Sequence, residues 1–276
     1  MIHFRNLSFS YAQNLRNVFE NLDLQVQPLS WVAFTGPDGS GKTTLGKLVK
    51  GLLIPDSGAI GFDGTSPHGA DSVGYLGGDP ADFAVGITVE EDVVFGMENV
   101  GLPRSEMQER LHEALRLTGM EGMERRLVHT LSGGEQQKLA LAGVLAMRVK
   151  VLVVDEAFEM LDKPMRRSVR SLLTSLRRDP GLTIIEMTNS VEDMSWADRV
   201  VFLSNGAIEF DGTPAEFLAG RLGARWSSMN GGLHALQSAL YDRYPTLREE
   251  TGRPLTLLTL TSHIEKLRRN TRNRLR

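Results

Sequence analysis

The chain has 276 residues, a length typical of one large domain or of one domain with an extension, and 41% of them are hydrophobic. Charged residues make up 24%, so a folded core is expected and global disorder is not. The net charge of −3 is too close to neutral to predict nucleic acid or an acidic surface as a general partner. The absence of cysteine excludes disulfides, thiolate metal sites and thiol catalysis. No stretch approaches the ~20 apolar residues of a membrane helix, and the first residues lack the apolar run of a signal peptide, so we expect a soluble protein or one held at a membrane by a partner.

The N-terminal part predicts strands, because residues 2–11 and 22–26 alternate loosely between apolar and polar. Tyr11 closes the first of these runs. An aromatic residue on a strand most often packs in the core, but an exposed ring can instead stack on a nucleotide base. The residues alone favour the core position and leave the second interpretation open.

The segment from Trp31 to Gly51 organises the rest of the chain. Residues 31–35 form an apolar strand, residues 36–43 fit G-x-x-x-x-G-K-[ST] at every fixed position, and apolar residues then recur at helical spacing. In such a turn, successive backbone N–H groups face one pocket, and the following helix adds the positive end of its dipole. Lys42 supplies a cation for the outer phosphates of a nucleoside triphosphate, and the Thr43 hydroxyl can ligate its Mg²⁺. The predicted nucleotide-binding residues here are Gly36, Pro37, Asp38, Gly39, Ser40, Gly41, Lys42, Thr43 and Thr44.

Between residues 88 and 147 the pattern becomes helical. Leu111, Leu115 and Leu117 predict an apolar helix face, and Glu90 stands where an N-terminal capping carboxylate is expected. Within this segment, a glycine-rich break at residues 131–135 opens onto another helix and is a second place able to hold phosphate oxygens. Taken alone, the break is more typical of an ordinary capped helix start.

Residues 151–156 are four apolar residues followed by Asp155 and Glu156. A continuous apolar run is typical of a strand buried in a parallel sheet, and the carboxyl ends of such strands line the crevice where ligands bind. From there Asp155 can hold Mg²⁺ through its water shell, and Glu156 can polarise an attacking water. A solvated strand end is the alternative, but the upstream phosphate loop favours the catalytic interpretation.

Strands and helices continue to alternate, with a helix at 165–178, a strand at 182–188 and a hairpin at 200–210. This order predicts an α/β fold with a mainly parallel sheet. From residue 220 the sequence pattern changes, and it predicts a linker at 227–232, a helix at 233–244 and a basic tail at 266–276. Such a tail is usually solvated, and a weak contact with anionic lipid beside a membrane partner is the alternative.

Three motifs together resemble an ABC-type ATPase: a Walker A loop at 36–43, an LSGGE signature at 131–135 and a Walker B strand ending in Glu156. Within that superfamily, residues 83–99 and 101–104 are similar to the ATPase subunits of energy-coupling factor (ECF) transporters for vitamins and cobalt. The resemblance implies a P-loop NTPase core at residues 1–220, with N-terminal antiparallel strands and a helical subdomain at about 83–147. It also implies a C-terminal extension at 221–276, for which dimerisation is one candidate role.

The resemblance further implies roles for single residues. Tyr11 falls at the family's adenine-stacking aromatic, which reverses the preference for the core. Asp162 resembles the loop that crosses between two ATP sites, and a groove near residues 83–95 would receive a coupling helix from a membrane subunit. The signature residues that would contact ATP held by a second subunit are Ser132, Gly133, Gly134 and Glu135.

Two positions depart from the family pattern. Gly78 stands where the family has a glutamine that reports the γ-phosphate and Mg²⁺, and Asn189 stands where it usually has a switch histidine. Glycine offers no side chain for that role, and asparagine can hydrogen-bond a phosphate oxygen but cannot carry a positive charge. With Lys42, Glu156 and Asn189 as the expected catalytic residues, we expect ATP and Mg²⁺ to bind while hydrolysis at the chain's own phosphate loop is weakened.

These features predict an ATP-hydrolysing subunit at the cytoplasmic face of the membrane that drives an ECF-type importer of a vitamin or metal ion. The expected partners are a second ATPase subunit (a heterodimer being favoured over a homodimer), a transmembrane subunit and a substrate-binding membrane component, but not nucleic acid. Two alternatives remain: a soluble ABC ATPase without a membrane partner, and a regulatory subunit that binds ATP with little hydrolysis. The transported substrate cannot be inferred, because subunits of this kind do not contact it.

Overall fold

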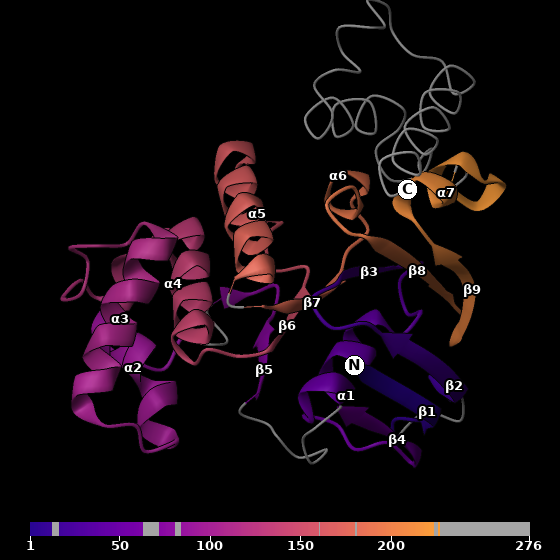
Figure 1. Ribbon diagram of the computed structural model, residues 1–276, viewed down its shortest axis with the longest axis horizontal. Coiled ribbons are helices and arrows are strands. Elements are labelled where there is room, and N and C mark those ends of the chain that lie inside the picture. Colours follow the sequence, from indigo (N-terminus) through magenta and orange to yellow (C-terminus); the bar gives the residue numbers. More distant parts are fainter. Residues whose placement is uncertain are drawn as a thin grey trace, which may run out of the picture.

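The structure is a computed structural model that describes residues 1–12, 17–62, 72–80, 84–159, 161–179, 181–223 and 226. Several predicted features lie outside these residues: Phe83, the linker at 227–232, the helix at 233–244 and the basic tail at 266–276. The described part combines two sheets and two groups of helices (Figure 1).

A three-stranded antiparallel sheet forms the N-terminal part, in the order β2-β1-β4. Its strands are β1 (Ile2–Phe9), β2 (Phe19–Val26) and β4 (Ser57–Phe62). The alternation in β1 is loose because the register with β2 shifts between Phe4 and Leu7, where Asn6 has a φ of 46°. Phe4 and Leu7 are therefore both buried, although three positions separate them. The predicted antiparallel N-terminal strands are confirmed.

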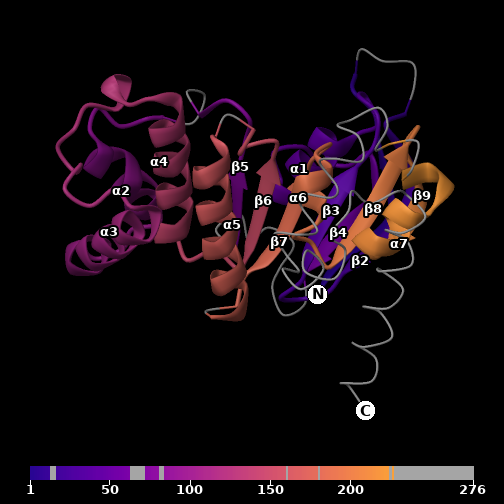
Figure 2. The ribbon, with the colours of Figure 1, turned by 90° about the horizontal axis from the view of Figure 1, so that it is seen from above.

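A six-stranded sheet forms the centre of the molecule, in the order β5-β6-β7-β3-β8-β9 (Figure 2). All neighbouring strands pair in parallel except β8 and β9, which form the predicted hairpin. Every residue of β3, β6 and β7 is buried, as their continuous apolar runs indicate. The strands are β3 (Trp31–Thr35), β5 (Val73–Leu76), β6 (Val151–Asp155), β7 (Thr183–Met187), β8 (Arg199–Ser204) and β9 (Ala207–Gly212).

Helices cover both faces of the central sheet. The helix α1 (Lys42–Lys50) lies between the two sheets, and α5 (Lys163–Arg178), α6 (Val191–Met194) and α7 (Pro214–Ala219) lie on the opposite face (Figure 1). The predicted start of α5 at residue 165 is wrong by two residues, because Asp162 caps the helix and Pro164 stands in its first turn. None of the helices in the described ranges combines the length and apolarity needed to cross a membrane.

The remaining helices pack on one another beside β5 and enclose a core of their own. They are α2 (Val89–Asn99), α3 (Arg104–Thr118), the short 3-10 helix Val128–Thr130 and α4 (Gly133–Ala146). Leu111 and Leu115 are buried as predicted, whereas Leu117 is only half-buried. The prediction for Glu90 is wrong: Glu91 closes the capping box with Thr88, because it occupies the third position of α2.

Candidate functional site

The loop between β3 and α1 has the backbone geometry of a phosphate-binding turn. Gly36 and Gly41 have φ values of 149° and 102°, which side chains rarely adopt. A Cβ on Gly36 would lie 2.0 Å from the carbonyl oxygen of Leu203, and one on Gly41 would lie 2.6 Å from the Phe19 ring. The first turn of α1 contains no acidic residue and has no side-chain cap, so its N–H groups remain available to an anion.

Lys42 folds back over this loop. Its Nζ donates to the carbonyl oxygen of Gly36 at 2.7 Å and of Pro37 at 3.3 Å. Burial lowers the pKa of Lys42, and the negative charges of nearby acids, Glu156 first, oppose that shift. The ammonium group thus lies at the wall of the pocket, within reach of phosphates that enter it.

A cavity of about 370 Å³ opens in front of the loop and brings most of the predicted nucleotide-binding residues together. Gly36, Pro37 and Ser40 do not line it, although the first two hold Lys42 in place. Its lining consists of Tyr11, Val18, Asp38, Gly39, Gly41, Lys42, Thr43, Thr44 and Glu156.

Asp155 ends β6 beside the cavity and is held by two hydroxyl groups. Thr43 Oγ1 donates to Asp155 Oδ1 at 3.2 Å, and the Tyr75 hydroxyl donates to Asp155 Oδ2 at 2.7 Å. A hydroxyl and a carboxylate are hard oxygen donors of the kind that Mg²⁺ prefers, and the ion usually takes its other ligands from phosphates and water. In the described part of the chain, no group of three or more His, Asp or Glu side chains could hold an ion without such phosphates. The donor set therefore fits Mg²⁺ that arrives with a nucleotide.

Glu156 follows in a left-handed conformation, with a φ of 55°. Its N–H donates to the carbonyl oxygen of Met187 at 3.1 Å, and the turn directs Glu156 into the lining of the cavity. Burial raises the pKa of Glu156, the charge of Glu159 raises it further, and Lys42 opposes both. A raised pKa suits a carboxylate that must accept a proton from an attacking water.

Tyr11 lies at the rim of the cavity and is 37% exposed. Its hydroxyl lies 3.1 Å from Thr44 Oγ1, and its ring packs edge-on against Phe9 with a centroid distance of 5.0 Å. The ring is thus fixed from one side and accessible from the other. Stacking on adenine stays a prediction that this position allows.

The signature residues lie in the first turn of α4 and do not line the cavity. Ser132 caps the helix: Glu135 N donates to its Oγ at 3.3 Å, and Ser132 N donates to Glu135 Oε2 at 2.8 Å. Arg126 pairs with the other Glu135 oxygen at 2.9 Å. Gly133 and Gly134 complete this turn, so the capped helix start and the signature coincide.

The two departures from the family pattern flank β6. Gly78 follows β5 and Asn189 follows β7, and these are the strands on either side of β6. A Cβ at Gly78 would have the carbonyl oxygen of Asp155 as its nearest neighbour, at 3.8 Å, so a Cβ meets no clash there. Asn189 Oδ1 is buried, with no hydrogen-bond partner among the described residues. Asp162 caps α5, where its Oδ1 accepts from Met165 N at 2.8 Å.

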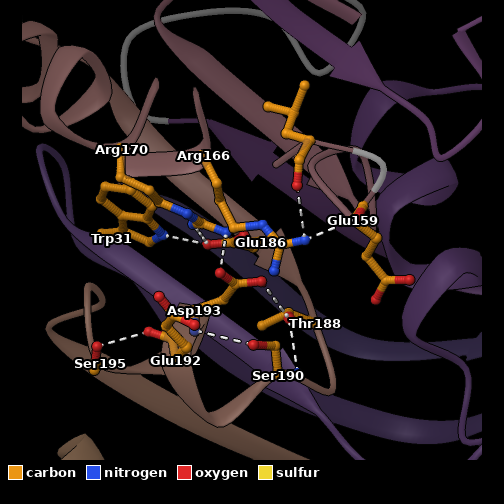
Figure 3. A network of polar contacts seen from close by, with 11 residues as sticks. Trp31, Glu159, Arg166, Arg170, Glu186, Thr188, Ser190, Glu192, Asp193 and Ser195 are labelled. Carbon is orange, nitrogen blue, oxygen red and sulfur yellow. Dashed lines mark hydrogen bonds and ion pairs between the residues drawn. The ribbon is translucent and has the colours of Figure 1, made fainter. Parts of the chain in front are cut away.

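Sequence reasoning missed a buried ion network behind the site (Figure 3). Arg170 of α5 donates to Glu186 Oε2 of β7 at 2.5 Å and pairs with Asp193 Oδ1 of α6 at 2.9 Å. Trp31 Nε1 donates to the same Glu186 oxygen at 2.8 Å. The guanidinium lies over the rings of Trp31 and Phe158 at 5.4 and 5.3 Å. The three charged residues are 1%, 2% and 3% exposed, respectively.

This network holds the segment that carries Asn189. Thr188 Oγ1 donates to Asp193 Oδ2 at 3.3 Å, and Ser190 N donates to Thr188 Oγ1 at 3.0 Å. Two carboxylates share one guanidinium, and burial raises the pKa of Glu186 although Arg170 opposes the shift. The one signal in the sequence was a glutamate within an otherwise apolar strand, since a charge in such a strand requires a partner.

Comparisons with known proteins agree with this geometry. The ABC transporter family matches residues 19–159. The energy-coupling factor transporter ATP-binding protein EcfA1 of Ligilactobacillus salivarius is 39% identical over 220 residues, 78% of each chain. Its counterpart from Leuconostoc mesenteroides is 40% identical over 224 residues, 78% of this chain and 82% of that one.

Solved structures show the same relationship. The cbiO1 protein from Clostridium perfringens, described as part of the ABC transporter complex cbiONQ, has a TM-score of 0.72 and 28% identity, over 91% of this chain and 98% of that one. The ATP-binding cassette MJ0796, a dimer bound to ADP and Pi, has a TM-score of 0.70 over 78% of this chain and 99% of that one, and at 21% identity it shows the fold alone.

The chain belongs to the ABC transporter family. Its curated relatives are the ATP-binding subunits of energy-coupling factor transporters, and the cbiO1 structure agrees with that placement. The predictions of an ABC-type ATPase, of its α/β P-loop fold and of its likeness to the ECF group are confirmed.

Proposed function

We propose that this chain is the ATP-binding and ATP-hydrolysing subunit of an ECF-type importer of a vitamin or metal ion, working at the cytoplasmic face of the membrane. The observation that carries the proposal is the convergence of the phosphate loop, Lys42, Thr43 and Glu156 on one cavity, with Asp155 held beside it by Thr43. The ECF relatives and the cbiO1 protein, described as part of a transporter complex, support the membrane assembly.

The residues of the cavity divide the work of hydrolysis. The loop N–H groups and Lys42 would hold the phosphates, and the Tyr11 ring would stack on the adenine. Thr43 and Asp155 would hold Mg²⁺, which neutralises charge on the phosphate oxygens when bound. Glu156 would accept the proton of the attacking water, and its raised pKa supports that role.

A second ATPase subunit would complete the site. Ser132, Gly133, Gly134 and Glu135 lie outside the chain's own cavity, which supports a contact with ATP held by a facing subunit. Asp162 would lie on the loop between the two sites. ATP would favour the closed dimer and ADP the open one, and that difference in affinity would move the attached membrane subunits.

Gly78 and Asn189 favour a heterodimer with unequal sites. One composite site would use this chain's intact signature and hydrolyse well, whereas the other would use its phosphate loop and mostly bind. The open space beside Gly78 and the unpartnered Asn189 Oδ1 support a weakened site. The same observations favour the alternative of a regulatory subunit that holds ATP, should both sites prove inactive.

A groove between the central sheet and the helical subdomain would receive the membrane subunit. It has a volume of about 400 Å³, and Phe95, Val144 and Met147 are among its mostly apolar lining. Val85 in its lining and nearby Ile87 are 59% and 70% exposed, which is unusual for large apolar side chains and typical of a docking surface. A short apolar helix from a transmembrane subunit fits this lining, and a substrate-binding membrane component would complete the importer.

Purification of the tagged full chain from detergent-solubilised membranes tests the assembly. We expect a second ATPase and an integral membrane subunit to accompany it, and recovery of an active chain alone would support a soluble ABC ATPase. In the complex, Glu156→Gln should reduce turnover less than the same change in the partner ATPase. Equal losses would contradict unequal sites, and ATP binding without phosphate release would support the regulatory alternative.

A further inference from the structure

Tyr75 lies between the docking groove and the acid that would hold Mg²⁺. Tyr75 is among the residues that line the groove, as are Val144 and Met147. Its hydroxyl donates to Asp155 Oδ2 at 2.7 Å, beside the nucleotide cavity. One half-buried residue therefore borders both sites.

The pairing of the strands explains why Tyr75 reaches this carboxylate. Tyr75 pairs with Val153 in the parallel register of β5 and β6. Because side chains alternate along a strand, Tyr75 lies on the same face as Asp155, two residues beyond Val153, and α1 covers that face. The ring lies close to α1, since a Cβ on Gly46 would be 3.4 Å from it.

The two oxygens of Asp155 have different partners. Oδ1 faces Thr43, the other proposed metal ligand, whereas Oδ2 is held by Tyr75. A hydrogen bond to the far oxygen of a ligating carboxylate fixes the orientation of the near one and tunes metal affinity. Gly78, three residues beyond Tyr75, has no side chain that could make such a contact from the end of β5.

We propose that Tyr75 is a positioning residue that links the groove to the metal-holding carboxylate. Its hydroxyl orients Asp155 for Mg²⁺, and its ring passes changes in the groove to that carboxylate. The proposal rests on the proposed function, which supplies the nucleotide, the metal and the docked helix. It adds a contact through Tyr75 at the strand end where Gly78 provides none.

The variant Tyr75→Phe tests the first half, because it removes the hydroxyl and keeps the ring. The affinity of the purified full chain for a fluorescent ATP analogue is measured in Mg²⁺ and in EDTA. We expect affinity about tenfold weaker in Mg²⁺, the lower end of the effect of removing a hydrogen bond to a metal ligand, and unchanged affinity in EDTA. The matched control is Thr174→Val, which removes a half-buried hydroxyl that donates to Arg170 O at 2.8 Å within α5. It should leave both affinities unchanged.

Two results would overturn the claim that the Tyr75 hydroxyl orients Asp155 for Mg²⁺. Unchanged affinity in Mg²⁺ would show that the hydroxyl does not influence the metal. An equal loss in Mg²⁺ and EDTA would show that it supports the pocket as a whole. If the wild-type chain binds the analogue in neither medium, the proposed function fails and takes this inference with it, so the two failures are distinguishable.

A label in the groove tests the second half, and the absence of cysteine makes single-site labelling direct. Gly143 of α4 lines the groove, and a Cβ there meets nothing within 4 Å, so Gly143→Cys can carry an environment-sensitive fluorophore. Saturating Mg²⁺ and ATP should change its emission in the wild-type background and leave it nearly constant with Tyr75→Phe. An equal response in both backgrounds would contradict the link, because coupling between two sites must act in both directions.

Discussion

Two acidic side chains on neighbouring strands of the central sheet, Asp155 and Glu186, have different kinds of partner. In the register of β6 and β7, Val154 pairs with Glu186 and Asp155 pairs with Met187. Asp155 and Glu186 are therefore one residue out of step, and they point to opposite faces of the sheet. Asp155 faces α1 and two neutral hydroxyl groups, whereas Glu186 faces α5 and the guanidinium of Arg170.

The difference lies in where the positive charge comes from. At Glu186 the fold supplies its own cation and an indole N–H, so the acid is satisfied within the core. At Asp155 the hydrogen-bond donors are two neutral hydroxyl groups, and Glu156 has a strained backbone. An acid paired with an internal cation fixes the structure, whereas an acid held by neutral groups is available to a ligand.

The largest effect, on the stability of the fold, is expected at Glu186 from Arg170→Met. Removal of the guanidinium leaves the carboxylates of Glu186 and Asp193 buried without a cation, so the free energy of unfolding should fall by about 3–5 kcal/mol. Arg148→Met is the control, because its pair with Glu113 is 49% and 44% exposed and should contribute ~0–1 kcal/mol. Urea denaturation of both full-length variants measures the difference. Similar small losses would show that the buried network does not fix the fold.

A smaller effect is expected at the nucleotide site from Asn189→His, which should raise the rate of ATP hydrolysis. A charged donor to a phosphate oxygen is stronger than a neutral amide by roughly 1–1.5 kcal/mol, so phosphate release should rise about tenfold. An unchanged rate has two explanations, since either Asn189 suffices or Gly78 sets the limit. The double variant with Gly78→Gln separates them, because a Cβ at Gly78 meets no clash. No gain in the double variant would refute the weakened site.

The sequence predicted the residues of the nucleotide site better than those of the buried ion network. The glycine turn, Lys42 and the acids after β6 follow from local patterns, since each depends on neighbours in the chain. For residues 165–178 the sequence predicts only a helix, and the packing of α5 on the sheet brings Arg170 into contact with Glu186. Tyr75 was likewise hidden, because the pairing of β5 with β6 places its hydroxyl on Asp155.

The smallest effect is on stability and comes from the ionised carboxylate of Glu156. The pKa of Glu156 is raised in the folded protein, chiefly by burial, so ionisation of this carboxyl opposes folding. The loss of stability appears as the pH rises from the pKa of the unfolded chain through the raised pKa of the folded one. Glu156→Gln removes the charge and should raise the melting temperature slightly at neutral pH. The gain should vanish below about pH 4, where the carboxyl is protonated in both the folded and the unfolded chain. Thermal scans at several pH values measure this gap, and a gap that widens toward acid would contradict the sign of the shift.

The most direct test of the account is the affinity of the full-length chain for ATP in the presence of Mg²⁺, measured by calorimetry for the wild type and for Lys42→Ala. We expect binding by the wild type and affinity weaker by roughly tenfold or more in the variant, because a charged donor at the phosphates is lost. Equal affinities, or no binding by the wild type, would contradict it.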